Sequence, residues 1–172
     1  MKRFSLYTIL AGLFLGSSLS IAQDVRAESA AETPALSTVA DSLSKLASVG
    51  APSFNKDAEY FIYLFSASWC GPCRRVMPQI VNYYKDVLSK DKRVEIILLD
   101  LDRTEDAAKA YIAHYNVDFY TIMGTTPGIE NQLPGAYQVR GIPHYIVVDK
   151  NGKKISSGHA AGLIPTVQKL IN

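Results

Sequence analysis

The sequence predicts an α/β protein in which a mixed β-sheet is flanked by helices on both faces. Apolar runs short enough for buried strands occur at 60–65, 94–99 and 144–149, and stretches with helical spacing alternate with them. Strands separated by helices indicate crossover units and a parallel sheet. Asn151-Gly152 is a strong signal for a two-residue hairpin turn, so the last strand pair adds an antiparallel edge.

The order of the predicted elements follows from hydrophobic spacing and from turn and capping residues. Thr104 is suited to cap the helix that follows it, and Pro78 is expected to kink the helix that contains it. In chain order we expect a helix over 34–49, a strand over 60–65, a helix over 70–88, a strand over 94–99, a helix over 104–115, a short strand over 117–123, a turn-rich loop over 124–128, a short helix over 130–137, a strand over 144–149, its hairpin partner over 153–156 and a closing helix over 164–170.

The first 22 residues have the pattern of a secretory signal peptide. Lys2 and Arg3 give a positive start, an apolar stretch follows over 4–15, and Ser20-Ile21-Ala22 fits the small-x-small cleavage rule. An uncleaved anchor is the alternative, but the apolar stretch is short for a membrane span of about 20 residues. We therefore expect export to the periplasm or the medium. The expected organisation is a signal peptide over 1–22, a flexible lead-in over 23–33 and one domain over 34–172.

Composition and charge exclude two broad classes of protein. With 48% hydrophobic and 20% charged residues, the chain has the composition of a globular protein rather than a disordered one. The formal charge is +2, and residues 1–22 hold two of the 18 basic residues and no acid, so 16 basic and 16 acidic residues remain after cleavage. Nothing in this balance indicates a nucleic-acid partner.

The chain has two cysteines, Cys70 and Cys73, and their position indicates redox chemistry. Cys70 follows a predicted buried strand and opens a helix, where free N–H groups and the helix dipole lower a thiol pKa below its usual value of about 8.5. Cys73 lies one turn further, within reach of the Cys70 sulfur, so it can resolve a mixed disulfide. Gly71 permits the tight loop, and Pro72 suits a first helical turn.

Three other interpretations of the cysteine pair remain open. A structural disulfide closing so small a loop would constrain the unfolded chain little. A structural zinc site needs four ligands, and His114, His144 and His159 lack ligand spacing to the pair, so no metal is expected. Two inert core cysteines would not be expected around a Gly-Pro turn between a strand and a helix. Redox exchange is the favoured interpretation.

The segment Ser66-Ala67-Ser68-Trp69-Cys70-Gly71-Pro72-Cys73-Arg74 resembles the active site of the thioredoxin superfamily. Two further landmarks support this resemblance. Val139-Arg140-Gly141-Ile142-Pro143 matches the segment that carries the family's cis-proline, and Pro78 matches its helix-kinking proline. The resemblance covers about residues 55–172. The motif is similar to those of tryparedoxin and nucleoredoxin. The segment 116–152, with its inserted strand and loop before the cis-proline, and the signal peptide are more similar to the exported TlpA/ResA-type group.

The resemblance implies a thioredoxin fold, a set of site residues and a set of partners. Cys70 would be the nucleophile and Cys73 the resolving thiol of a redox disulfide, with no dissociable cofactor. Protein thiols and disulfides would be the substrates of a monomer, and an upstream thiol protein, for which a membrane carrier is one candidate, would supply electrons. The residues implied to bind substrate are Trp69, Gly71, Pro72, Ile142 and Pro143.

One departure from the superfamily pattern concerns proton transfer. The superfamily places a buried Asp six residues before the first Cys and pairs it with a Lys on the next strand, whereas this sequence has Leu64 and Leu98 there. Losing only one partner would leave a buried charge unpaired, at a cost of several kcal/mol, so losing both is physically consistent. The usual proton acceptor for Cys73 is then missing, and water or another carboxylate must serve.

The sequence therefore predicts an exported protein disulfide reductase. An oxidant or isomerase is the alternative within this class, and a metal-handling or cytochrome-assembly thiol-binding module is the alternative from another class. Three polar residues near the motif remain weaker candidates: His144 could titrate near the sulfurs, and Arg74 and Arg75 could assist the thiolate or bind an acidic partner.

Overall fold

The computed structural model of the chain describes residues 38–50, 53–136 and 139–172. The predicted signal peptide over 1–22 and lead-in over 23–33 lie outside these described residues. Within the described ranges, every helix is too short or too polar to span a bilayer.

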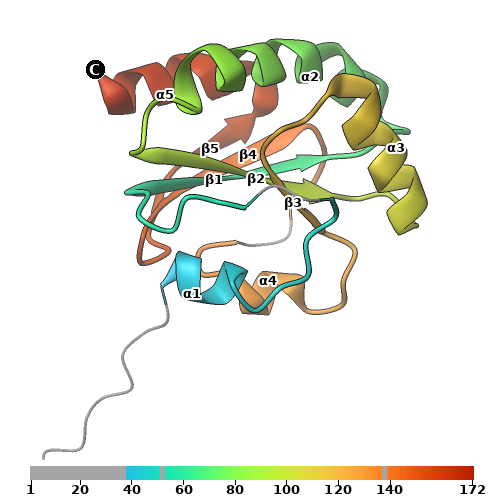
Figure 1. The fold of residues 1–172 in the computed structure, drawn as a ribbon, viewed down its shortest axis with the longest axis horizontal. Coiled ribbons are helices and arrows are strands. Elements are labelled where there is room, and N and C mark those ends of the chain that lie inside the picture. Colours follow the sequence, from blue (N-terminus) through green and yellow to red (C-terminus); the bar gives the residue numbers. More distant parts are fainter. Residues whose placement is uncertain (1–37, 51–52, 137–138) are drawn as a thin grey trace, which may run out of the picture. The chain divides into compact units, whose positions relative to one another are not determined.

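The centre of the fold is a five-stranded mixed sheet in the order β3-β2-β1-β4-β5 (Figure 1). Strands β1, β2 and β3 run parallel, and β4 and β5 are antiparallel to their neighbours, so the predicted antiparallel edge is confirmed. The strands are β1 (Tyr60–Ser66), β2 (Val94–Asp100), β3 (Tyr120–Met123), β4 (His144–Asp149) and β5 (Lys154–His159).

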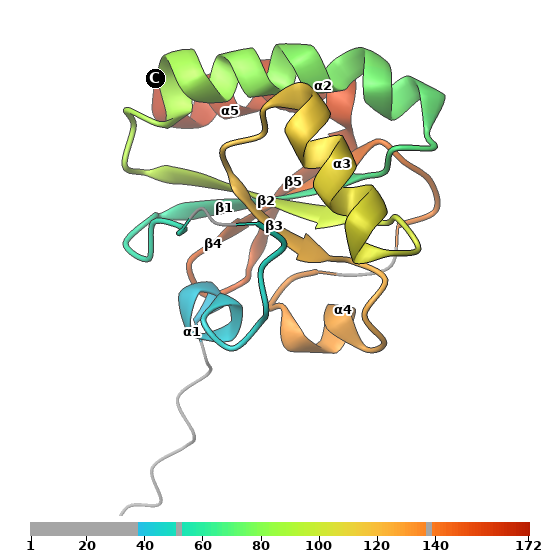
Figure 2. The ribbon, with the colours of Figure 1, turned by 45° about the vertical axis from the view of Figure 1, so that its right-hand side comes forward.

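Helices cover both faces of the sheet, which confirms the predicted fold class. Three helices, α2 (Gly71–Tyr83), α3 (Glu105–Tyr115) and α5 (Leu163–Ile171), pack over one face, and α1 (Val39–Leu43) and α4 (Ile129–Gln132) lie on the other (Figure 2). A π-helical turn (Tyr84–Leu88) extends α2, and a short 3-10 turn (Ala160–Gly162) precedes α5.

Each face of the sheet carries its own hydrophobic core because side chains alternate along a strand. Leu64 of β1 and Leu98 of β2 belong to the core beneath α2, whereas Phe65 and Leu99, one position further, belong to the core against α1 and α4. Almost every residue of β1 and β2 is buried, as expected for central strands covered on both sides. These two strands end together, next to the cysteine motif.

The helix predicted over 34–49 is wrong in length, because α1 ends at Leu43. The chain then turns, and Ser48 forms an isolated antiparallel bridge with Ile122 of the edge strand β3. The Val49 N–H donates to the carbonyl oxygen of Thr121 at 2.8 Å. Unpaired backbone groups on an edge strand thus outweigh the helical pattern of apolar residues in this segment.

Other boundaries differ from the predictions for local reasons. The helix predicted over 130–137 ends at Gln132, because Leu133 precedes Pro134 and a residue before proline disfavours helical geometry. The strand predicted over 117–123 begins only at Tyr120, after Asn116 ends α3 in the left-handed conformation. The hairpin partner predicted over 153–156 extends to His159. The helix predicted over 70–88 changes from α to π geometry at Tyr84.

Candidate active site

The two cysteines lie where β1 feeds into α2, as the sequence predicts. Cys70 is the N-cap of α2, and its Sγ accepts the backbone N–H of Cys73 at 3.2 Å. A disulfide joins the pair, with 5.2 Å between the Cα atoms. A sulfur that accepts an N–H at a helix N-terminus is in the position that favours a thiolate after reduction.

The two sulfurs differ in their access to solvent. Cys70 is 5% exposed, whereas Cys73 is fully buried. Both pack against Ala67, with Leu101 and Ile142 partly buried beside them. Cys70 is therefore the more accessible of the two cysteines to a partner from outside.

The predicted docking residues Ile142 and Pro143 lie beside Cys70. The carbonyl oxygen of Ile142 is 3.7 Å from the Cys70 Sγ. The Ile142-Pro143 peptide bond is cis, as the resemblance implies. The backbone of Ile142 thus borders the more accessible sulfur.

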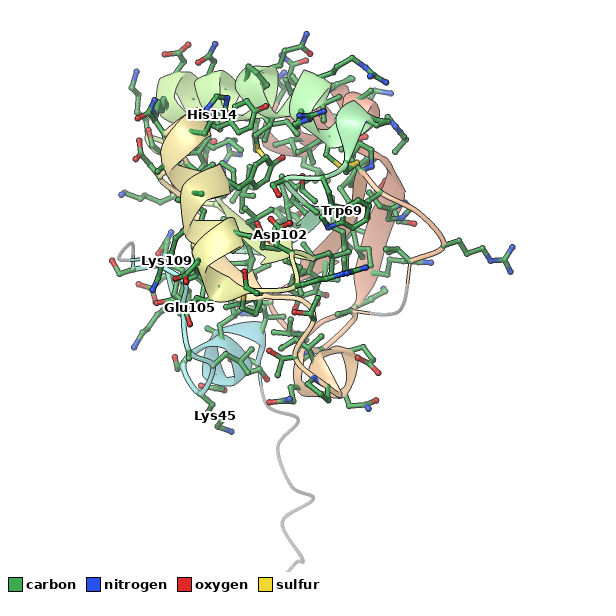
Figure 3. All side chains as sticks on the ribbon, turned by 90° about the vertical axis from the view of Figure 1, so that its right-hand side faces the viewer. Lys45, Trp69, Asp102, Glu105, Lys109 and His114 are labelled. Carbon is green, nitrogen blue, oxygen red and sulfur yellow. A yellow bond between two sulfur atoms is a disulfide. The ribbon has the colours of Figure 1, made fainter. Side chains whose placement is uncertain are left out.

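Trp69 is an exposed aromatic surface rather than a core residue. Its side chain is 63% exposed, and its Nε1 donates to the carbonyl oxygen of Leu101 at 3.3 Å. Ser68 holds the loop before it, because its N–H and its Oγ both donate to the carboxylate of Asp102, at 3.1 and 2.8 Å. Trp69 and Asp102 are labelled in Figure 3. The anchoring by Asp102 is a site feature that the sequence analysis missed.

The first turn of α2 carries the other residues singled out from the motif. Gly71 and Pro72 occupy the first helical positions. Proline is suited to this turn because an N–H group there has no partner within the helix. Arg74 and Arg75 are exposed on the same turn, and the guanidinium of Arg75 lies near Gly71, 3.8 Å from where a Cβ would stand. Both arginines therefore border the site without being buried in it.

His144 lies on the other face of the sheet from α2. It pairs in register with Phe65 on β1 and His159 on β5, and Phe65 belongs to the core against α1 and α4. Burial lowers the pKa of His144, and the nearby His159 lowers it further. His144 therefore lies on an inner strand, between β1 and β5, on the face of the sheet away from α2.

The two leucines predicted to stand in place of the superfamily's buried Asp–Lys pair are neighbours in the structure. Leu64 and Leu98 are register partners on β1 and β2, and both are fully buried. Two positions further along the same pair of strands, Ser66 pairs with Asp100. Asp100 is fully buried as well, and sequence analysis did not single it out. The available signal was an acid at alternate spacing from Leu98 in an apolar strand.

Metal ligands do not gather in the described ranges, where no group of three His, Cys, Asp or Glu residues could hold an ion.

The fold and the site together define a thioredoxin-fold protein: a mixed sheet, helices on both faces, a helix-capping cysteine pair and a cis-proline beside it. A sequence model described as Thioredoxin-like matches residues 57–154. The chain belongs to this family.

Relatives agree with that assignment over about half of the chain. A Bacillus cereus thiol-disulfide oxidoreductase ResA is 36% identical over 93 residues, covering 53% of this chain and 49% of the relative. Bos taurus nucleoredoxin is 33% identical over 92 residues, covering 54% and 21%. The chain thus spans half or less of the length of these curated relatives.

Solved structures confirm the thioredoxin fold. Tryparedoxin I from Leishmania major superposes with a TM-score of 0.54 at 30% identity, covering 65% of this chain and 76% of that one. A thioredoxin from Wuchereria bancrofti superposes with a TM-score of 0.54 at 28% identity, covering 67% and 81%.

Proposed function

We propose that this protein is an exported thiol-disulfide oxidoreductase that reduces disulfides in other proteins. One observation carries the proposal: the Cys70 sulfur accepts a helix N-terminal N–H, while its partner Cys73 is fully buried behind it. This asymmetry gives each sulfur a different part in the exchange. Membership of the Thioredoxin-like family and the similarity to thiol-disulfide oxidoreductase ResA support the same reaction.

In the proposed reaction, the reduced Cys70 thiolate attacks one sulfur of a substrate disulfide. The other substrate sulfur leaves, and a mixed disulfide joins Cys70 to the substrate. Cys73 then loses its proton and attacks the Cys70 sulfur, which releases the second substrate sulfur and forms the Cys70–Cys73 disulfide. Two electrons pass to the substrate, so another thiol protein must reduce the pair again.

The substrate is proposed to lie against Trp69 and the Ile142 backbone, with Gly71, Pro72 and Pro143 completing the contact surface. Trp69 offers an exposed flat face, and the Ile142 carbonyl borders the accessible sulfur. An extended peptide could pair with free backbone groups there as an added strand.

Catalysed reduction of insulin disulfides by dithiothreitol tests the proposed reaction. The protein should accelerate precipitation of the insulin B chain, and Cys70→Ser should remove the acceleration. Arg93→Lys is a matched control, because Arg93 lies far along the chain from the motif and pairs with Asp91. A rate equal to that of dithiothreitol alone would contradict the proposal.

Export rests on the pattern of residues 1–22 and on the similarity to ResA. Mass spectrometry of the exported fraction should give an N-terminus at Gln23 or, as the second choice, at Glu28 after Ala27. Retention of Met1 in that fraction would contradict cleavage.

A further inference from the structure

A buried carboxylate lies at the end of the sheet that carries the cysteine motif. Asp100 is the last residue of β2 and is fully buried. Its Oδ1 accepts the N–H of Asp102 at 2.8 Å, whereas its Oδ2 is buried without a hydrogen-bond partner among the described residues. Because buried polar atoms are nearly always paired, an unpaired carboxylate oxygen needs an explanation, and a part in proton transfer is one that fits its place in the fold.

The groups around Asp100 are polar or acidic rather than cationic. Ser66 is its register partner, and the Ser66 Oγ is 2.8 Å from the hydroxyl of Tyr111 on α3. The Asp102 carboxylate lies two residues on, held by Ser68. The three ion pairs found in the described ranges lie elsewhere in the fold. Burial, followed by the charge of Asp102, raises the pKa of Asp100 to about 7.

Asp100 on β2 and Cys73 on α2 lie on the same side of the sheet. Because side chains alternate along a strand, Asp100 and Ser66 lie on the same face of the sheet as Leu64 and Leu98, the face that α2 and α3 cover. Cys73 is the first of the inward-facing residues of α2, the others being Met77, Ile80 and Val81. The residues that follow Ser66 and Asp100, Ala67 and Leu101, pack directly against the cysteine pair.

Cys73 needs a proton acceptor if it resolves a mixed disulfide, because the thiolate is the attacking species. Its burial disfavours the thiolate, and the residues packed around it, Ala67, Leu101 and Ile142, supply only hydrocarbon side chains. We propose that Asp100 is the buried acceptor that takes up the Cys73 proton during resolution. This inference rests on the proposed function.

The proposed step balances in protons and electrons. The Cys73 S–H bond breaks and its proton goes to the Asp100 carboxylate. The Cys73 sulfur then forms a bond to the Cys70 sulfur, and the bond between Cys70 and the substrate breaks. The substrate leaves as a thiolate, and Asp100 later returns the proton to solvent.

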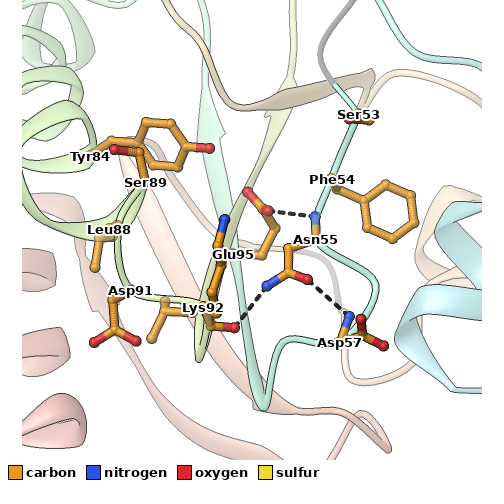
Figure 4. A pocket seen from close by; sticks show the side chains of 11 residues that line it. Ser53, Phe54, Asn55, Asp57, Tyr84, Leu88, Ser89, Asp91, Lys92 and Glu95 are labelled. Atoms are coloured by element: carbon orange, nitrogen blue, oxygen red, sulfur yellow. Dashed lines mark hydrogen bonds between the residues drawn. The ribbon is translucent and has the colours of Figure 1, made fainter.

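The same strand offers a matched control in Glu95, which is 5% exposed and borders an open pocket of about 460 Å³ at the other end of β2 (Figure 4). Burial raises its pKa as well. Unlike Asp100, Glu95 has a hydrogen-bond donor for each carboxylate oxygen: the N–H groups of Asn55 and Ile96 donate to them at 2.7 and 3.2 Å.

Stopped-flow reaction of the reduced protein with one equivalent of 5,5′-dithiobis(2-nitrobenzoate) separates the two steps. Attack by Cys70 releases one thionitrobenzoate, and resolution by Cys73 releases the second. Cys73→Ser should release only the first, which assigns the phases. The rates are measured from pH 6 to 9 for the unmutated protein, Asp100→Asn and Glu95→Gln.

The proposal predicts that Asp100→Asn leaves the first phase unchanged and slows the second at pH 7 by roughly 10- to 100-fold, at or below the usual contribution of a general base. The unmutated second phase should rise with pH through about 7, where Asp100 ionises. Asp100→Glu should restore that dependence, and Glu95→Gln should keep it.

Three outcomes decide between the claims. A second phase in Asp100→Asn with the unmutated rate and pH dependence overturns the role of Asp100 while leaving the proposed function intact. A slowing common to both phases also overturns it, because it would mark a structural defect. A missing first phase in the unmutated protein overturns the proposed function itself. Asp100→Ser carries the same test should Asp100→Asn fail to fold.

Discussion

The two ends of β2 carry buried acids in opposite situations. Glu95 near the start accepts two backbone N–H groups, which ties the segment before β1 to the sheet. Asp100 at the end accepts one and keeps an oxygen unpaired. Burial raises the pKa of both carboxyls, to about 7 for Asp100. The difference indicates that Glu95 serves the fold, whereas Asp100 keeps an oxygen available at the end of the sheet that carries the cysteine motif.

The raised pKa of Asp100 also predicts that the stability of the fold depends on pH. Asp100 has a folded pKa of about 7, above its unfolded value of about 4, so folding favours its protonated form. Its stabilising contribution is present below pH 4 and is lost as pH rises to 7, by up to about 1.4 kcal/mol per pH unit. Asp100→Asn should remove this slope.

Urea unfolding of the disulfide form from pH 4 to 8 measures that effect. The free energy of unfolding should fall with rising pH in the unmutated protein and stay flatter in Asp100→Asn. Equal slopes in the two proteins would mean that Asp100 titrates near its ordinary value.

Removing the carboxylate at the other end should cost stability without affecting exchange. Glu95→Ala leaves the N–H groups of Asn55 and Ile96 without their acceptor, at a cost of roughly 1–3 kcal/mol. Glu95→Gln keeps an acceptor oxygen and should cost less. Urea unfolding gives the stability, and the rate of insulin reduction gives the activity. A loss of insulin reduction in a folded Glu95→Ala protein would contradict the assignment of a purely structural role to Glu95.

The smallest predicted effect on stability is that of Trp69→Ala, because Trp69 is 63% exposed. The free energy of unfolding should change by no more than about 0.5 kcal/mol. The KM for a protein disulfide should rise about 5-fold or more, since exposed aromatic contact residues commonly contribute over 1 kcal/mol to binding. Reaction with a small aromatic disulfide should change less. Equal changes for the two substrates would remove the docking role.

The sequence predicted the features that depend on local patterns. Strand burial, the cap at Thr104 and the cysteine pair at the start of α2 are confirmed. The hairpin is confirmed too, but the predicted two-residue turn is wrong: the Asp149 N–H donates to the Lys153 carbonyl oxygen, so the loop has three residues, 150–152, and only Gly152 of them has a positive φ. The confirmed features depend on apolar alternation, turn chemistry and capping residues, each of which acts within a few positions of the chain.

The features that the sequence analysis missed depend on contacts between distant segments. The short α1 follows from the bridge between Ser48 and Ile122 on the edge strand. Asp100 gains its significance only from its register with Ser66 and its place on the sheet face that α2 and α3 cover. Alternation with Leu98 marked it as inward-facing, but the unpaired oxygen is a property of the packed structure.

Trapping of mixed disulfides tests the division of roles between Cys70 and Cys73 most directly. Cys73→Ser should form a covalent complex with a disulfide substrate through Cys70, visible on non-reducing gels and by mass spectrometry. Cys70→Ser should trap almost nothing, because Cys73 is fully buried. Equal trapping by both variants, or trapping by Cys70→Ser alone, would contradict the assignment of nucleophile and resolving thiol.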